Sequence, residues 1–184
     1  NVSELETFFS EQALMRHRVM VEVEYLLALV EHKSFQKTRT LSKKAFNSLK
    51  GLYVEFSSTH FKEIKKIEKK TNHDVNAVVV FVSEKLKKIG RDDLVPFVHF
   101  GLTSEDINNI SYSLMAQGAV DSVMIPSVKG VLKELKALSK KTKSLSLLSL
   151  THGQPATTTT LGKELAVFVS RVEREIALIK KMKL

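Results

Sequence analysis

A histidine in an uncharged, hydroxyl-rich segment is the first candidate for chemistry in this sequence. The stretch "SLTHGQPATTTT" (149–160) contains His152, and neither a charged residue nor a large apolar residue lies between it and Leu161. Such a segment contributes little to a hydrophobic core. Because an imidazole gains and loses a proton near neutral pH, His152 is a candidate general acid or general base.

A second histidine stands where a helix is expected to begin. The stretch "TNHDVNAV" (71–78) places Asn72, His73 and Asp74 together, directly before an apolar run. The first backbone N–H groups of a helix have no partner inside the helix, so they can hold an anion. Asp74 also has a purely structural interpretation, because a carboxylate at this position can cap the helix. The segment therefore indicates either anion binding beside a titratable ring or an ordinary helix cap.

The stretch "LTSEDINN" (102–109) has the same two interpretations. Thr103 or Ser104 is typical of an N-cap, and Asp106 is in place to complete a capping box. The same hydroxyl and N–H groups would suit a carboxylate ligand at a helix N-terminus. The other histidines are weaker candidates for a catalytic role. His17, His32 and His60 lie among surface-type residues, and the apolar surroundings of His99 in "FVHFG" suggest a structural role.

Helices must position these residues. Apolar residues recur at helical spacing over 19–30, 41–56, 61–67, 75–89, 107–138 and 161–184. The windows "VMVEVEY" and "VVVFV" have strand-like features, but the length of the periodic match favours helices, and Gly90 is a plausible stop. Pro126 should kink or divide its helix. Residues 140–160 are expected to be a non-helical connection, so the predicted fold class is all-α.

Composition excludes several classes of protein. The 184-residue chain has no Cys, which excludes disulfides and Cys-ligated zinc, and no metal-ligand spacing predicts a metal site. No apolar run is long enough to span a membrane, and the first residues lack the features of a signal peptide. The net charge is +9, but the lysines alternate with glutamates and no Arg–aromatic cluster accompanies them. We therefore expect neither nucleic-acid binding nor membrane binding.

Three segments in order resemble the adenylosuccinate lyase family of the fumarase/aspartase superfamily. They are "TNHDVNAV" (71–78), "FVHFGLTSEDINN" (97–109) and "THGQPATTTTLGKE" (151–164). The likeness extends from "FFSEQALMRHRVMVEVEYL" (8–26) to "GKELAVFVSRVER" (162–174). One local departure is Thr158, where the family usually has Pro. The resemblance implies β-elimination of fumarate from adenylosuccinate, giving AMP, and from the succinyl-carboxamide ribotide of purine synthesis, without a cofactor.

The resemblance also implies roles for individual residues. His152 matches the general acid that protonates the departing nitrogen, and His73 matches the second active-site histidine. The remaining matches are to substrate-binding positions, and two of them hold a succinyl carboxylate. These carboxylate-binding positions are Thr103 and Ser104, and the others are Asn72, Asp74, Thr151 and Gln154.

The family pattern is incomplete in this chain. The catalytic base of the family is a Ser in a "SSxMPxKxN" segment, which this sequence does not contain. We expect residues 1–101 to form a small N-terminal helical domain and 102–184 to begin the long-helix bundle of a cytoplasmic homotetramer that binds an anionic nucleotide. The helical pattern still running at the last residues suggests truncation, so the chain alone should be inactive. The alternative is a non-catalytic helical interaction module or pseudoenzyme of the same fold.

Overall fold

The computed structural model describes residues 2–34 and 40–182. The described residues are mostly helical, which confirms the predicted fold class, and they include one two-stranded sheet that the sequence did not predict. The chain divides into two compact units, Asn1–Gln117 and Gly118–Leu184. The expected boundary between residues 101 and 102 concerns the domains of the family rather than these compact units, and it stays a prediction.

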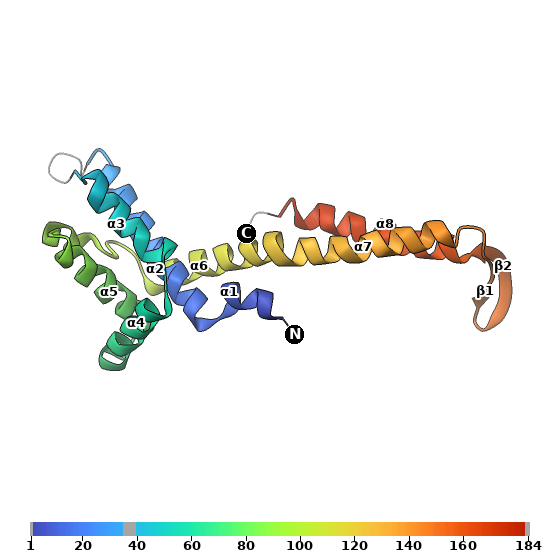
Figure 1. Cartoon of the computed structure of the whole chain (residues 1–184), viewed down its shortest axis with the longest axis horizontal. Helices are drawn as coiled ribbons and strands as arrows, with labels where there is room; N and C mark the ends of the chain where they lie inside the picture. Colours follow the sequence, from blue (N-terminus) through green and yellow to red (C-terminus); the bar gives the residue numbers. More distant parts are fainter. Residues whose placement is uncertain (1, 35–39, 183–184) are drawn as a thin grey trace. The chain divides into compact units, whose positions relative to one another are not determined.

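Helix α2 is the centre of the first unit (Figure 1). It packs against α3, α4 and α5. The elements of this unit are η1 (Ser3–Leu5), α1 (Glu6–Phe9), α2 (Glu11–Glu31), α3 (Lys43–Val54), α4 (Ser58–Thr71), α5 (Asp74–Lys88), the 3-10 helix η2 (Asp92–Phe97) and α6 (Ser104–Ala119). The two windows with strand-like features therefore lie in α2 and α5, as predicted.

The core of the first unit joins these helices through apolar side chains. Leu26 of α2, Leu49 of α3, Ile64 of α4 and Phe81 of α5 belong to one buried cluster. Each is at most 1% exposed. Burying a large apolar side chain stabilises a fold by about 1.5–3 kcal/mol, so this cluster accounts for the arrangement of α2 to α5. Helix α5 ends at Lys88, and Gly90 follows with a φ of 71°, which fits its predicted role as a stop.

Pro126 has the predicted effect on its helix. After α6 the chain forms a π-helical turn, η3 (Val120–Met124), and Pro126 is the second residue of α7 (Ile125–Lys141). Proline has no backbone N–H, so the preceding turn loses one α-helical hydrogen bond. The hydroxyl of Ser127 donates to the carbonyl of Val123 at 2.8 Å, which satisfies one carbonyl of this irregular turn.

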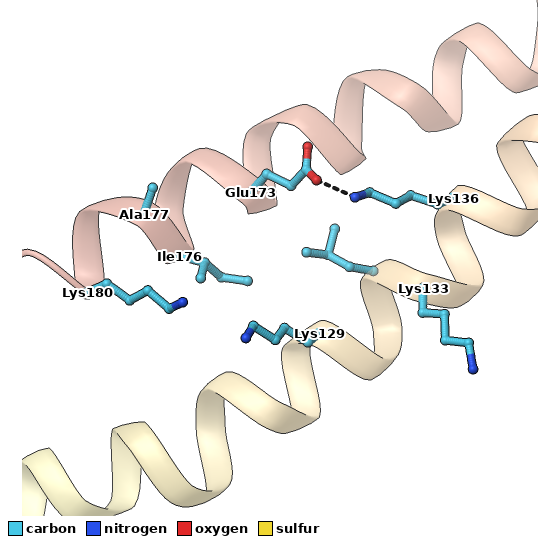
Figure 2. Close-up of a pocket in the computed structure, with 8 residues that line it drawn as sticks. Lys129, Lys133, Lys136, Glu173, Ile176, Ala177 and Lys180 are labelled. Atoms are coloured by element: carbon cyan, nitrogen blue, oxygen red, sulfur yellow. Dashed lines mark ion pairs between the residues drawn. The ribbon is translucent and has the colours of Figure 1, made fainter.

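The second unit is a pair of packed helices joined by a β-hairpin. Helix α7 packs along α8 (Leu161–Ile179), and Leu132 and Val169 are buried between them. Figure 2 shows Lys136 and Glu173 as an ion pair across these helices, with Ile176 pointing into the space between them. Lys129 and Lys180 border the same groove.

The connection between α7 and α8 is a hairpin rather than an irregular loop. Strand β1 (Ser146–Thr151) pairs antiparallel with β2 (Gln154–Thr160), and a bulge interrupts the register between Leu148 and Leu150. The prediction of a non-helical connection is confirmed, although α7 extends to Lys141 and the paired strands were not foreseen. Thr160 caps α8 by accepting from the N–H of Lys163 at 3.2 Å.

Candidate functional site

His73 itself caps helix α5. Asn72 ends α4 in the left-handed conformation with a φ of 51°, so the chain reverses and His73 becomes extended. The ring Nδ1 of His73 accepts a hydrogen bond from the backbone N–H of Asn76 at 3.1 Å. While Nδ1 accepts this bond, the neutral ring carries its proton on Nε2. His73, rather than Asp74, is therefore the N-cap residue of α5, and it presents an N–H donor to its surroundings.

Asp74 has two protein partners of its own. Its Oδ1 accepts from the N–H of Val75 at 2.8 Å, and its Oδ2 lies 2.7 Å from a terminal nitrogen of Arg18. Partial burial opposes ionisation, but the Val75 N–H and the Arg18 guanidinium hold the pKa of Asp74 below its usual range. Asp74 is thus an anchored carboxylate at the start of α5.

The surface beside His73 is an open pocket that carries both signs of charge. Lys65 pairs with Glu11 and with Glu68, each at 2.6 Å. Within the residues that the structure describes, Lys69 has no ion pair, so it contributes an uncompensated positive charge. The lining residues are Lys65, Glu68, Lys69, Asn72, His73 and Asp74.

The start of α6 forms the predicted capping box. The N–H and the hydroxyl of Thr103 donate to Oδ2 of Asp106 at 2.7 and 2.8 Å, and the N–H of Asp106 approaches the Thr103 hydroxyl oxygen at 3.4 Å. The N–H and hydroxyl of Thr103 hold the pKa of Asp106 below its usual range. Ser104 follows as the first residue of the helix.

A buried arginine joins these two helix starts, and the sequence interpretation missed it. Arg18 of α2 is 3% exposed. Its guanidinium pairs with Asp74 on α5, and its Nε donates to Oδ1 of Asn108 on α6 at 3.0 Å. The available signal was a pair of charged residues four apart, Arg18 and Glu22, beside the apolar stripe of α2. Charges at core-facing positions are uncommon unless they are paired.

Glu22 is the second such charge, and His99 is its partner. Glu22 is completely buried, and its Oε1 lies 2.6 Å from Nδ1 of His99. Burial raises the pKa of Glu22, and the hydrogen bond with His99 opposes that rise. His99 has a left-handed backbone with a φ of 61°. This contact agrees with the structural interpretation of His99. His17 is also buried, at 6% exposure, rather than lying at the surface.

His152 occupies the tip of the β-hairpin in the second unit. Thr151 and Gln154 are the last strand pair, so His152 and Gly153 form a two-residue turn. Their φ values are 49° and 75°, and positive values at both positions are the requirement of a type I′ turn. Thr151, His152 and Gln154 are all exposed. In the described parts of the chain, the His152 ring has no hydrogen-bond partner, so it is available to a ligand.

The structure thus brings the predicted residues into two groups. Asn72, His73 and Asp74 belong to the first unit with Thr103 and Ser104, and Arg18 links their helices there. Thr151, His152 and Gln154 form the hairpin tip of the second unit. Among residues 2–34 and 40–182, no group of three or more His, Cys, Asp or Glu side chains could hold a metal ion. No helix in these ranges is long and apolar enough to span a membrane.

The chain is similar to several known proteins. The model of the lyase family matches residues 1–183. Adenylosuccinate lyase of Dictyostelium discoideum is 41% identical over 179 residues, which is 95% of this chain and 38% of that protein. Adenylosuccinate lyase of Escherichia coli strain K12 is 41% identical over 175 residues, again 95% of this chain and 38% of the relative. The chain therefore spans less than two fifths of the length of these curated relatives.

Solved structures share the fold at lower sequence identity. A fumarate lyase from Mesorhizobium superposes with a TM-score of 0.75 at 18% identity, covering 97% of this chain and 39% of that one. A β-carboxy-cis,cis-muconate cycloisomerase from Acinetobacter calcoaceticus superposes with a TM-score of 0.72 at 20% identity, covering 97% and 40%. These likenesses show the fold. The family model, which matches nearly the whole sequence, shows that the chain belongs to the lyase family of the fumarase/aspartase superfamily.

Proposed function

We propose that this chain is part of an adenylosuccinate lyase. The reaction is a β-elimination that releases fumarate from adenylosuccinate, giving AMP, and from the succinyl-carboxamide ribotide. A base takes a proton from the succinyl carbon, the C–N bond breaks, and an acid protonates the departing nitrogen. The observation that carries the proposal is the 41% identity to curated adenylosuccinate lyases over 95% of the chain.

His152 is proposed as the general acid. The type I′ turn places His152 at the hairpin tip, where it is exposed, and no protein partner competes for the ring nitrogens among the described residues. An acid must reach the atom that it protonates, so an exposed ring on a short, defined turn suits this role. Thr151 and Gln154 flank the turn as the proposed substrate contacts.

His73 is proposed to position the substrate in support of that acid. The cap holds its Nδ1, so Nε2–H is the donor that faces a ligand. Asn72 and Asp74 are proposed as neighbouring substrate contacts, and the cation of Lys69 in the same pocket favours an anionic nucleotide.

Thr103 and Ser104 are proposed to bind a succinyl carboxylate at the start of α6. Asp106 already accepts from the N–H and the hydroxyl of Thr103. The incoming carboxylate therefore binds first at Ser104. It reaches Thr103 only when the hydrogen bonds from Thr103 to Asp106 break. Helix N-terminal N–H groups and the helix dipole favour a negative charge at this position.

The proposed active enzyme needs more than this chain. The sequence lacks the "SSxMPxKxN" segment that carries the catalytic base in the family. We further propose that the active form is a cytoplasmic homotetramer, in which subunits combine to complete each site. The 184-residue chain alone should therefore release no fumarate, and turnover by the purified chain would contradict this part of the proposal.

The direct test is fumarate release from adenylosuccinate by the protein expressed from its whole reading frame. The His152→Ala variant should lose at least about 100-fold in kcat, since general acid–base catalysis contributes about 10²–10⁴-fold. His32→Ala is the matched control, because His32 is an exposed histidine at the end of α2, and it should retain wild-type activity. Release that survives in His152→Ala would move the acid to another residue. No release by the wild type would favour the non-catalytic module.

A further inference from the structure

Arg18 sits where three helices meet, and its whole side chain is withdrawn from solvent. It is 3% exposed. Nε donates to Asn108 of α6 at 3.0 Å, one terminal nitrogen lies 2.7 Å from Asp74 of α5, and the other lies 3.9 Å from Sδ of Met15. A buried guanidinium is costly unless its donors are satisfied. Each of the three guanidinium nitrogens has one of these partners, and two of the partners come from α5 and α6.

The partners of Arg18 on α5 and α6 lie close to groups with a proposed role in substrate binding. Asp74 follows His73, whose ring caps α5. Asn108 comes four residues after Ser104, so the two side chains lie on the same face of α6. The Nδ2 group of Asn108 donates to Glu105 at 3.4 Å, which directs its Oδ1 toward Arg18.

Apolar side chains pack beside these polar groups. Val21 of α2, Val75 of α5 and Ile107 of α6 form a separate buried cluster, with Leu102 packed against it. Val75 and Ile107 are the immediate neighbours of Asp74 and Asn108 in the sequence. The cluster brings the three helices together, and the planar fork of the guanidinium then sets the relative positions of their polar groups.

We propose that Arg18 is a positioning residue that sets the placement of His73 relative to the Thr103–Ser104 helix start. The inference rests on the proposed lyase function for its meaning in catalysis, but its structural part is independent of that function. Arg18 is buried, so it acts through Asp74 and Asn108 without touching the substrate. A lysine offers a single charged group, which cannot hold both partners in the same plane.

The first test uses NMR of the present chain and needs no substrate. In the wild type, the ring nitrogens of His73 should report the tautomer with the proton on Nε2 and Nδ1 as an acceptor. In Arg18→Lys, the tautomers should mix, and exchange of the Asn76 amide should rise by about tenfold relative to the Phe81 amide within α5. A purely structural role would accelerate both amides equally. Unchanged ring signals and an unchanged ratio would overturn the proposal.

Two further variants guard against loss of folding and against general charge effects. Asn108→Ala removes the contact with α6 and keeps the ion pair of Arg18 with Asp74, so it should perturb the amides of Ser104 and Glu105 more than those of α5. Lys85→Gln is the matched control, because Lys85 pairs with Glu63 at 2.7 Å between α5 and α4. It should leave the His73 ring signals unchanged, and a change of the same size as in Arg18→Lys would overturn the proposal.

The second test measures kcat and KM for adenylosuccinate with the protein from the whole reading frame. A displacement of about 1 Å can cost about 100-fold, so Arg18→Lys should lose about 10- to 100-fold in kcat/KM with a similar melting temperature. Wild-type kcat/KM in Arg18→Lys would overturn the proposal. If the wild type releases no fumarate, the proposed function fails, and the NMR test still decides whether Arg18 positions His73.

Discussion

Replacing Gly162 by alanine tests the junction that holds the His152 hairpin on its helices. Gly162 is the second residue of α8, and its N–H donates to the carbonyl of Thr142 at 3.1 Å. Its carbonyl accepts from the hydroxyl of Ser139 at 2.6 Å. The neighbouring N–H of Leu161 donates to the carbonyl of Leu145 at 2.9 Å. These bonds tie the start of α8 to the end of α7 and to the base of the hairpin.

The magnitude follows from what a new methyl group would meet. A Cβ on Gly162 would lie 2.5 Å from the backbone oxygen of Ser139 and 2.6 Å from Cα of Lys143. Both obstacles are backbone atoms, so they cannot move aside as a flexible side chain would. Overpacking of this kind costs about 1–3 kcal/mol, and alanine returns up to about 1 kcal/mol of helix propensity. We expect a net loss of about 1–2 kcal/mol in the free energy of unfolding of the second unit.

Gly130 provides a matched control in the same unit. It lies within α7, and a Cβ built there meets nothing within 4 Å. Gly130→Ala should therefore stabilise α7 by about 0.5–1 kcal/mol through backbone entropy alone. The two alanine variants should thus differ by about 2 kcal/mol, although both replace a helical glycine.

The assay is urea unfolding followed by circular dichroism, together with amide hydrogen exchange in α7 and α8. A difference of about 2 kcal/mol corresponds to a ratio of about 30 in the exchange rates of amides that open with the unit. If Gly162→Ala proves as stable as Gly130→Ala, the close approach of α7 and α8 at this junction is wrong. The same result would leave the His152 hairpin without its proposed anchor.

Three further predictions concern the first unit. Asp74→Asn should cost about 1 kcal/mol near neutral pH, a small value because the carboxylate is 44% exposed beside buried Arg18. The folded pKa of Asp74 is lowered, so its stabilisation is present above the unfolded pKa and is lost as pH falls through the folded value. The urea midpoints of wild type and variant should therefore converge in acid. A constant difference between the two midpoints would contradict the ion pair. Burial and the hydrogen bond to Glu24 raise the pKa of Tyr53 to about 12. The stabilisation from this tyrosine is therefore present below its unfolded pKa and is lost as pH rises through about 12. Ultraviolet titration should show a tyrosine ionisation at this high pH, and Tyr53→Phe should remove it. Thr103→Ala should cost about 1 kcal/mol by deleting the capping box, as measured by urea unfolding, and an unchanged midpoint would argue against the cap.

Local signals predicted the places where helices begin. Thr103 and Asp106 form their box as expected, and Thr160 precedes Leu161 as the cap of α8. Such caps involve residues three apart, so the sequence contains both partners of the interaction. The start of α5 was located correctly, but its N-cap is His73 and not Asp74, the residue that the structural interpretation considered. The ring of His73 performs a task that the usual preferences give to Asp74.

The hairpin shows the limit of local reasoning. Its turn consists of His152 and Gly153, which lacks the Asn-Gly or Asp-Gly signal of a typical type I′ turn. The strand residues Leu147, Leu148 and Leu150 do not alternate strictly with polar residues, so the sequence showed no one-sided strand pattern. All three are exposed in this chain. A non-helical connection was predictable, whereas its pairing with a run of threonines was not.

The sequence by itself determined the helical class, the helix starts and, through its resemblance to a family, the histidines that carry the proposed chemistry. Only the tertiary structure revealed how the two helix starts of the first unit are connected. Arg18 and Asn108 are 90 positions apart, and their contact exists because Val21, Val75 and Ile107 pack three helices together. Caps depend on neighbours along the chain and can be read locally. A buried guanidinium depends on partners that packing brings from distant segments, so its role emerged only once the chain was folded.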